Sequence, residues 1–238
     1  MTSHILDQVP FRLNRSLLMK KLRIKEDTRY SREFLALADE VEAIARPKAL
    51  YRVSFIDSLE QDQVVIDGVT FRSRVLAVNL EAVHRVFPYT ATCGVEVDDW
   101  SHSVHDLLHS FWVDTMKELA VRAAMAQLRL QVKRRFEPGR ISAMSPGSLG
   151  DWPIQQQKPL FALLGDAEAQ IGVRLNDSFL MIPSKSVSGI WFPTQTNFES
   201  CQLCPRDRCP GRRSAYDPGL YEKRYTSVVN SDAAADSA

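Results

Sequence analysis

An Asp-Gly pair between two short apolar runs limits the folds that this chain can adopt. Residues 64–66 and 69–71 have the character of strands, and Asp67-Gly68 between them is a dipeptide that tight hairpin turns prefer. Because such a hairpin pairs its strands antiparallel, an all-parallel, doubly wound sheet is excluded. Residues 101–136 have helical periodicity and a basic end, which predicts one long helix or two. We therefore expect one α+β domain with a mainly antiparallel sheet and this long helix packed on one face.

Composition and charge narrow the class of protein. A length of 238 residues fits one large domain or two small ones. A formal net charge of +1 argues against a general nucleic-acid binder, which needs a marked basic excess. No apolar run approaches the roughly 20 residues of a membrane span, and residues 1–15 lack the apolar region of a secretory signal. These features predict a cytoplasmic protein with neither nucleic acid nor membrane as a partner.

The other elements expected from the sequence are short. Ser31 is placed to cap a helix that Pro47 ends. Shorter helices are expected at residues 15–22 and 160–164, and strands at residues 50–56, 83–91, 171–175, 179–182 and 188–192. The expected organisation is an N-terminal arm (1–28), a core (29–199), a cysteine-rich segment (200–217) and a disordered tail (218–238).

Three cysteines are crowded near the C-terminus. Cys201, Cys204 and Cys209 follow a Cys-x2-Cys-x4-Cys spacing, which suits a soft metal ion or an iron–sulfur cluster. Cys93 is the other cysteine of the chain, and we expect it to be the fourth ligand. Clustered thiols in a chain without a secretory signal are more often metal ligands or redox groups than disulfides. The alternatives are a disulfide between Cys201 and Cys209, or plain reduced thiols.

Two stretches of sequence carry a resemblance to a known family. Residues 145–153 read Ser-Pro-Gly-Ser-Leu-Gly-Asp-Trp-Pro, and residues 171–192 include Pro-Ser-Lys-Ser-Val-Ser-Gly-Ile-Trp-Phe. Together they resemble the activation domain of cobalamin-dependent methionine synthase, and more closely its free-standing relatives, which often have a similar cysteine-rich C-terminus. The resemblance covers roughly residues 29–217. It implies a single curved domain with a twisted, mainly antiparallel sheet.

The resemblance also implies a function. Such a domain binds S-adenosylmethionine and presents its methyl group to the cobalamin of a partner after inactive cob(II)alamin has been reduced. The expected partners are a corrinoid-binding protein, or a methionine synthase without its own activation domain, and an electron donor. Since this chemistry is reductive, it favours an iron–sulfur cluster over zinc at the cysteines. The chain itself has no Asp-x-His-x-x-Gly motif with which to carry cobalamin.

The same resemblance assigns candidate residues for binding S-adenosylmethionine. The loop with Ser145, Pro146, Gly147 and Trp152 is expected to supply backbone and aromatic contacts. Arg140 is expected to pair with the ligand carboxylate. The alternatives are that Trp152 packs the loop onto the core and that Arg140 is a solvated charge.

Three further candidates lie outside that loop. Ser188 begins a small-residue strand whose backbone groups can line a pocket, and Phe198 lies near aromatic ligand contacts of the family. Glu118, with Asp114 as a second choice, is the nearest acid on the long helix for the ligand amine or sulfonium. Surface charge is the alternative role of both acids, and tight packing is that of Ser188.

Two functions are therefore compared. The first is an S-adenosylmethionine-binding reactivation factor that supports reductive remethylation of a corrinoid, as part of a methyltransferase system. The second is a non-enzymatic metal-binding scaffold or adaptor that kept the fold and lost the ligand site. Ala143 and the Ser148-Leu149 pair stand where the family usually has Arg and Tyr, and they favour the second.

Overall fold

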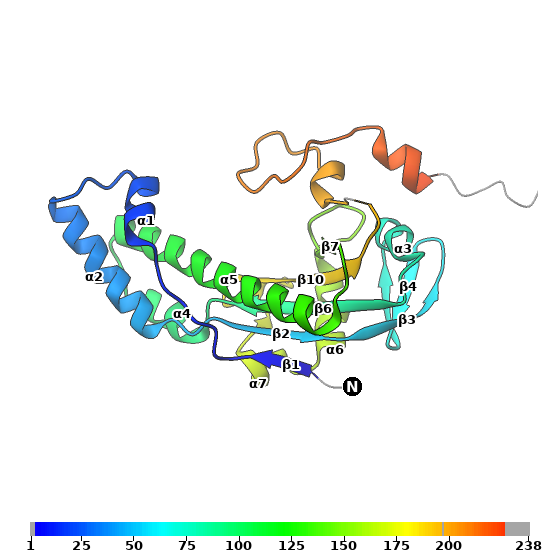
Figure 1. Ribbon diagram of the computed structural model, residues 1–238, viewed down its shortest axis with the longest axis horizontal. Helices are drawn as coiled ribbons and strands as arrows, with labels where there is room; N and C mark the ends of the chain where they lie inside the picture. Colours follow the sequence, from blue (N-terminus) through cyan, green and yellow to red (C-terminus); the bar gives the residue numbers. More distant parts are fainter. Residues whose placement is uncertain (1–2, 197, 227–238) are drawn as a thin grey trace, which may run out of the picture.

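The structure of the protein, a computed structural model, describes residues 3–196 and 198–226. A long antiparallel sheet forms its centre, with strand order β1-β2-β6-β3-β4-β5, and β10 joins β6 to β7 (Figure 1). Its strands are β1 (Ser3–Leu6), β2 (Lys48–Arg52), β3 (Ser54–Leu59), β4 (Gln63–Ile66), β5 (Val69–Arg72), β6 (Arg85–Thr92), β7 (Ile141–Met144) and β10 (Ser186–Pro193). A second small sheet pairs β8 (Arg174–Leu175) with β9 (Met181–Ile182). All pairings among the described strands are antiparallel, so the expected fold class is confirmed.

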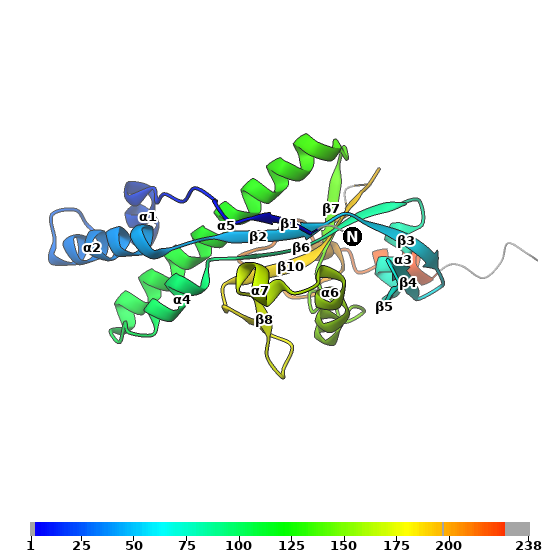
Figure 2. The ribbon, with the colours of Figure 1, turned by 90° about the horizontal axis from the view of Figure 1, so that it is seen from below.

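Helices cover both faces of the sheet. The α-helices are α1 (Arg15–Leu22), α2 (Arg29–Ile44), α3 (Arg74–Leu80), α4 (Val95–Ser101), α5 (Leu107–Phe136), α6 (Gln157–Leu164) and α7 (Ala167–Ile171). Three short turns of other helix types are η1 (Ile154–Gln156), η2 (Ser200–Leu203) and η3 (Glu222–Thr226). Helix α5 crosses one face, and α6 and α7 lie on the other (Figure 2). In the described parts of the chain, no helix combines the length and apolar character needed to cross a membrane.

Alternate side chains of the central strands point to opposite faces of the sheet, and each face has its own core. Tyr51, Tyr89 and Trp191 pack with Ala124 and Leu128 of α5. Leu50, Ile190 and Phe192, which are their neighbours in the sequence, point to the opposite face, where they and Val86 of β6 meet α3, α6 and α7. This period of two is what a sheet covered on both faces requires.

A third core lies beyond the sheet, where α1 and α2 pack on α4 and the first half of α5 (Figure 1). Phe34 of α2 meets Trp112 of α5 edge-to-face, with ring centroids 5.7 Å apart. Beside them lies a buried ion pair, in which Lys117 Nζ of α5 is 2.6 Å from Asp98 Oδ1 of α4. The Lys117 ammonium also donates to Ser101 Oγ at 2.9 Å. The ion pair therefore ties α4 to α5 inside this helical end of the molecule.

The Asp67-Gly68 hairpin forms as expected. Strands β4 and β5 pair along their length, with Gln63 opposite Arg72 at one end and Ile66 opposite Val69 at the turn. The backbone angle φ is 46° at Asp67 and 77° at Gly68. Two positive φ angles at the central positions are the requirement of the turn that best matches strand twist. The hairpin extends the sheet at the end covered by α3 (Figure 1).

The expected strand at residues 50–56 is two strands, β2 and β3, separated at Val53. Both pair with β6, where Tyr89 lies opposite Tyr51 and Val86 opposite Ser54. Pro88 lies in the stretch of β6 between these pairs, and it has no N–H to donate to a ladder. The neighbouring strand thus explains a break that the local pattern of residues 50–56 does not reveal.

Two other expectations need correction. Thr28, and not Ser31, caps α2: its hydroxyl accepts from Ser31 N, while Ser31 Oγ accepts from Thr28 N at 3.1 Å. The disordered tail was also placed too early. Tyr225 is buried, and its carbonyl accepts from Arg74 Nε at 2.8 Å, so residues 218–226 are part of the fold. The rest of the expected tail, residues 227–238, lies outside the described residues.

Candidate functional site

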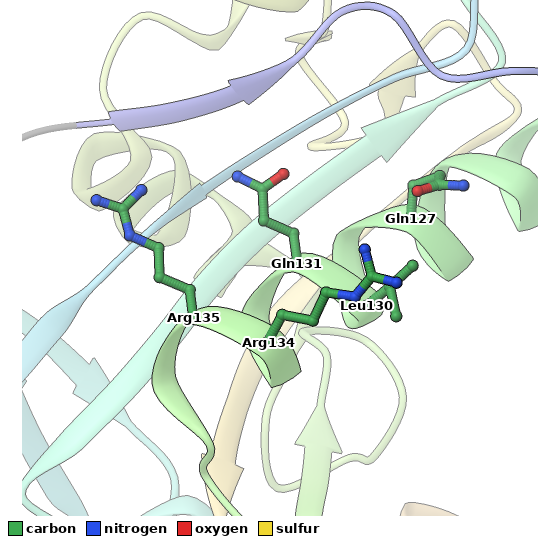
Figure 3. Close-up of a pocket in the computed structure, with 5 residues that line it drawn as sticks. All are labelled: Gln127, Leu130, Gln131, Arg134 and Arg135. Atoms are coloured by element: carbon green, nitrogen blue, oxygen red, sulfur yellow. The ribbon is translucent and has the colours of Figure 1, made fainter.

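A shallow groove runs along the second half of α5. One hollow of about 280 Å³ is lined by α5 side chains alone: Gln127, Leu130, Gln131, Arg134 and Arg135. A second hollow, of about 270 Å³, shares Gln127 and Gln131 with the first and continues to the N-terminal residues 5–9. Gln131 and Arg135 extend from α5 on the side of β1, and Arg134 folds back along the helix towards Leu130 (Figure 3). We call these two hollows together the α5 groove.

Charge is distributed unequally along the α5 groove. Asp7 lies on the wall formed by the N-terminal residues. Arg134 and Arg135 line the other hollow, and Arg135 Nη1 is 3.3 Å from His4 Nδ1 of β1. Partial burial, and then the charge of Arg135, lower the pKa of His4, so its neutral form is favoured beside this cation. The groove therefore offers a carboxylate on one wall and two guanidinium groups at one end.

The Ser-Pro-Gly loop, residues 145–153, is folded onto itself. Gly147 N donates to Trp152 O at 2.7 Å, and Ser148 N donates to Ser145 O at 3.1 Å. Gly147 has φ of 82°, and a side chain there would collide with Ile154. Pro146 is buried. Glycine is thus favoured at position 147 chiefly by the backbone conformation, since the end of the Ile154 side chain can shift.

Trp152 fixes this loop to the core. Its side chain is fully buried and packs edge-to-face on Phe71, with centroids 6.2 Å apart. Asp151 beside it accepts from Val75 N at 3.1 Å and from the hydroxyl of Ser73, at the start of α3. The packing role considered for Trp152 is therefore observed, whereas its contact with a ligand stays a prediction.

The loop also meets the start of β10 very closely. A side chain at Gly189 would collide with the carbonyl of Met144 and the hydroxyl of Ser145. Burial raises the pKa of Tyr89, whose hydroxyl is hydrogen-bonded to Ser145. Ser188 is buried, and its hydroxyl donates to Gln157 Oε1 at 2.8 Å. Ser145 and Ser188 are thus partners of protein groups here, and their roles towards a ligand stay predictions.

The remaining candidates lie apart from one another. Arg140 is exposed and lines a hollow of about 370 Å³ at the ends of β7 and β10, with Thr194 opposite. Phe198 is buried, and its carbonyl accepts from Ser142 Oγ at 2.9 Å. Glu118 pairs with Arg122 on the surface of α5, and Asp114 pairs with Lys185 at 2.8 Å. None of the three hollows described above contains all of these side chains.

The four cysteines are not gathered as expected. Cys93 is fully buried in the helical core with Phe34 and Trp112, whereas Cys204 packs against the core under α3 and α6. Burial raises the pKa of the Cys93 thiol to about 12, which disfavours the thiolate that metal ligation needs. Within residues 3–196 and 198–226, no three Cys, His, Asp or Glu side chains are grouped to hold a metal ion. The expectation that Cys93 closes a four-cysteine site therefore has no support in the geometry.

The α5 groove itself was not expected from the sequence. The sequence predicts an arm at residues 1–28 and relates the basic residues 133–135 to the helix dipole, so it does not bring Asp7 and this end of the helix together. Ser3–Leu6 has two polar residues followed by two apolar ones, so its pairing with β2 leaves no alternating pattern in the sequence.

Comparison of the sequence with protein families finds a match in the C-terminal part of the chain. The profile described as "Vitamin B12 dependent methionine synthase, activation domain" matches residues 145–209. The matched stretch contains the Ser-Pro-Gly loop, β10 and the three C-terminal cysteines. The chain thus resembles that activation domain in sequence over this stretch.

Comparison with solved structures extends the likeness to the fold. The chain is similar to the structure titled "Crystal Structure of the MetH Reactivation Domain bound to AdoHcy", with a TM-score of 0.59 and 16% sequence identity. The similarity covers 84% of this chain and 81% of that one. The protein therefore has the fold of a methionine synthase reactivation domain. Among curated proteins, no sequence matches the chain.

Proposed function

We propose that this protein is an S-adenosylmethionine-binding reactivation factor for the corrinoid of a cobalamin-dependent methionine synthase or related methyltransferase. The observation that carries the proposal is the activation-domain match over residues 145–209 on a chain with the reactivation-domain fold. The solved relative is bound to AdoHcy, the product that remains when S-adenosylmethionine has donated its methyl group.

The α5 groove supports the binding part of this proposal. S-Adenosylmethionine has a carboxylate at one end and two positive groups, the ammonium and the sulfonium. Arg134 is exposed in the groove, where it can pair with the carboxylate, and Asp7 on the opposite wall can attract the positive groups. Gln127 and Gln131, which belong to both hollows, offer amide groups between them. These residues bind and orient the methyl donor in the proposal.

The proposal divides the chemistry between this chain and its partners. The bound methyl donor supplies the methyl group, and an outside donor supplies the electron that reduces the partner's cob(II)alamin. This chain's own contribution is to hold the donor in position and to limit access of water. The adaptor function remains the alternative, and the closely packed Ser-Pro-Gly loop, with Ser145 and Trp152 occupied by protein contacts, is the observation that favours it.

Substitutions in the groove separate the two functions. Arg134→Ala should weaken S-adenosylmethionine binding about 10- to 150-fold, because a charge-assisted hydrogen bond contributes roughly 1.5–3 kcal/mol. Asp7→Asn should also weaken binding, and both effects are measured by titration calorimetry. Arg32→Ala, which removes an exposed arginine from α2, is the matched control and should leave the affinity unchanged.

Arg140→Ala tests the loop-side site in the same titration. A loss with Arg140→Ala and none with Arg134→Ala would move the carboxylate to the ends of β7 and β10. Absence of binding by the wild-type protein at millimolar ligand would reject the reactivation factor and favour the adaptor.

A further inference from the structure

The C-terminal cysteines lie on a loop that closes around one arginine. The guanidinium of Arg212 donates to the carbonyl of Cys201 at 3.0 Å, of Cys204 at 3.1 Å and of Ser214 at 3.3 Å, and also to that of Arg206. Four carbonyl groups from residues 201–214 are thus held by a single side chain. This arrangement brings the two ends of the loop together, while Cys201, Cys204 and Cys209 are free cysteines. We call residues 201–214 the cysteine loop.

The three thiols are placed on the same small structure. Cys201 and Cys204 are three residues apart at the end of η2, where Cys204 N donates to Cys201 O at 3.3 Å. Side chains at this spacing lie one above the other in a 3₁₀ turn. Arg213 N donates to Cys201 Sγ at 3.5 Å, and Arg212 N to Cys209 O at 3.1 Å. All three thiols are half-buried.

The cysteine loop is fixed to the body of the protein at its start. Glu199 carries an ion pair to Arg213 at 2.9 Å, and the preceding residue, Phe198, is buried. Leu203 and Cys204 pack against the core that contains Trp152. The loop is therefore a structured element with its thiols at the border of core and solvent, where a bound group can be both held and reached.

The chemistry of the loop favours a cluster over a single ion. The described residues include no three ligands close enough to enclose one metal ion. An iron–sulfur cluster has its own iron and sulfide atoms between its ligands, so its cysteine sulfurs lie farther apart than those around one ion. Three thiolates are also a concentration of negative charge. Arg206, Arg208 and Arg213 belong to the same loop and add positive charge to it.

We propose that Cys201, Cys204 and Cys209 bind one [4Fe–4S] cluster without Cys93, which leaves one iron open to a ligand from outside the chain. Arg212 is a positioning residue that holds the carbonyls of the loop. The proposal goes beyond the reactivation function, because cluster binding does not depend on S-adenosylmethionine or on a corrinoid partner. A negative result for cluster binding would therefore leave the proposed reactivation function untouched, and the reverse also holds.

The test is anaerobic reconstitution of the full chain with ferrous iron and sulfide, followed by iron and sulfide analysis and a visible spectrum. We expect a brown protein with about four iron atoms per chain. Cys201→Ser, Cys204→Ser and Cys209→Ser should each lose most of the iron. Cys93→Ser is the matched control and should keep all of it. In the Arg212→Ala variant, the affinity for the cluster, measured by competition with a chelator, should fall about 10- to 100-fold, as is typical when a residue that orients metal ligands is removed.

Alkylation of the thiols in the wild-type protein is a second measurement, which does not depend on whether the variants fold. In the wild-type protein, Cys201, Cys204 and Cys209 should resist alkylation until a chelator is added, while they react at once in protein that was never reconstituted. A colourless protein with one zinc ion per chain, or thiols that react equally in both samples, would overturn the proposal. Loss of iron from folded Cys93→Ser would overturn the three-cysteine ligation.

Discussion

Asp98→Ala should lower the free energy of unfolding by about 3–5 kcal/mol, because it leaves the Lys117 ammonium buried without its counter-charge. The two side chains are 8% and 7% exposed, and the Nζ–Oδ1 distance is 2.6 Å. Ser101 Oγ is the other hydrogen-bond acceptor of the ammonium, and it carries no charge to replace the carboxylate. The effect is measured by urea unfolding with a helix-sensitive signal.

A double substitution provides the control for this buried pair. Asp98→Leu with Lys117→Met removes both charges and should recover most of the stability lost in Asp98→Ala, since an apolar pair of similar volume needs no desolvation of charge. A loss below about 1 kcal/mol in Asp98→Ala would be typical of an exposed pair. Such a result would contradict the burial of this pair between α4 and α5.

Trp152→Ala should cost about 3–5 kcal/mol of stability, as is usual for removing a large buried aromatic side chain. The ring is fully buried against Phe71 and connects the Ser-Pro-Gly loop to the core under α3. The substitution should also loosen the end of the loop that the hydrogen bond from Gly147 N to the carbonyl of residue 152 closes. Proteolysis within residues 145–153 should therefore accelerate along with the loss of stability.

Trp152→Phe separates packing from hydrogen bonding. The indole Nε1 is buried without a protein partner, so its removal leaves no acceptor unsatisfied. We expect Trp152→Phe to cost less than about 1.5 kcal/mol. An equal loss in both variants would show that the indole nitrogen has a partner essential to the loop and would contradict the role of Trp152 as an apolar anchor.

Local signals in the sequence predicted most of the fold. The Asp67-Gly68 turn and the periodicity of residues 101–136 predicted the antiparallel pairing and α5, because these elements depend on short-range conformational preferences. The break at Val53 depends on Pro88 in the neighbouring strand, and the burial of Tyr225 depends on Arg74 and Asn79 of α3. Such contacts between distant segments leave no mark in the local pattern.

The candidate site was less predictable than the fold. The spacing of Cys201, Cys204 and Cys209 was visible in the sequence, but the location of Cys93 in another core was not. Counting thiols therefore suggested a fourth ligand that the topology separates from the other three. The α5 groove combines the N-terminal residues 5–9 with α5, and only the pairing of β1 with β2 brings them together.

In the proposed function, this chain presents the methyl group of S-adenosylmethionine to a corrinoid on another protein. The direct measurement uses S-adenosylmethionine labelled in its methyl group, a methionine synthase without its own activation domain that carries cob(II)alamin, and a low-potential electron donor. We expect the label to appear on the partner's corrinoid only when this chain is added, and Arg134→Ala to slow its appearance. Equal labelling with and without the chain, or no labelling while the partner's corrinoid is fully reduced, would contradict this function.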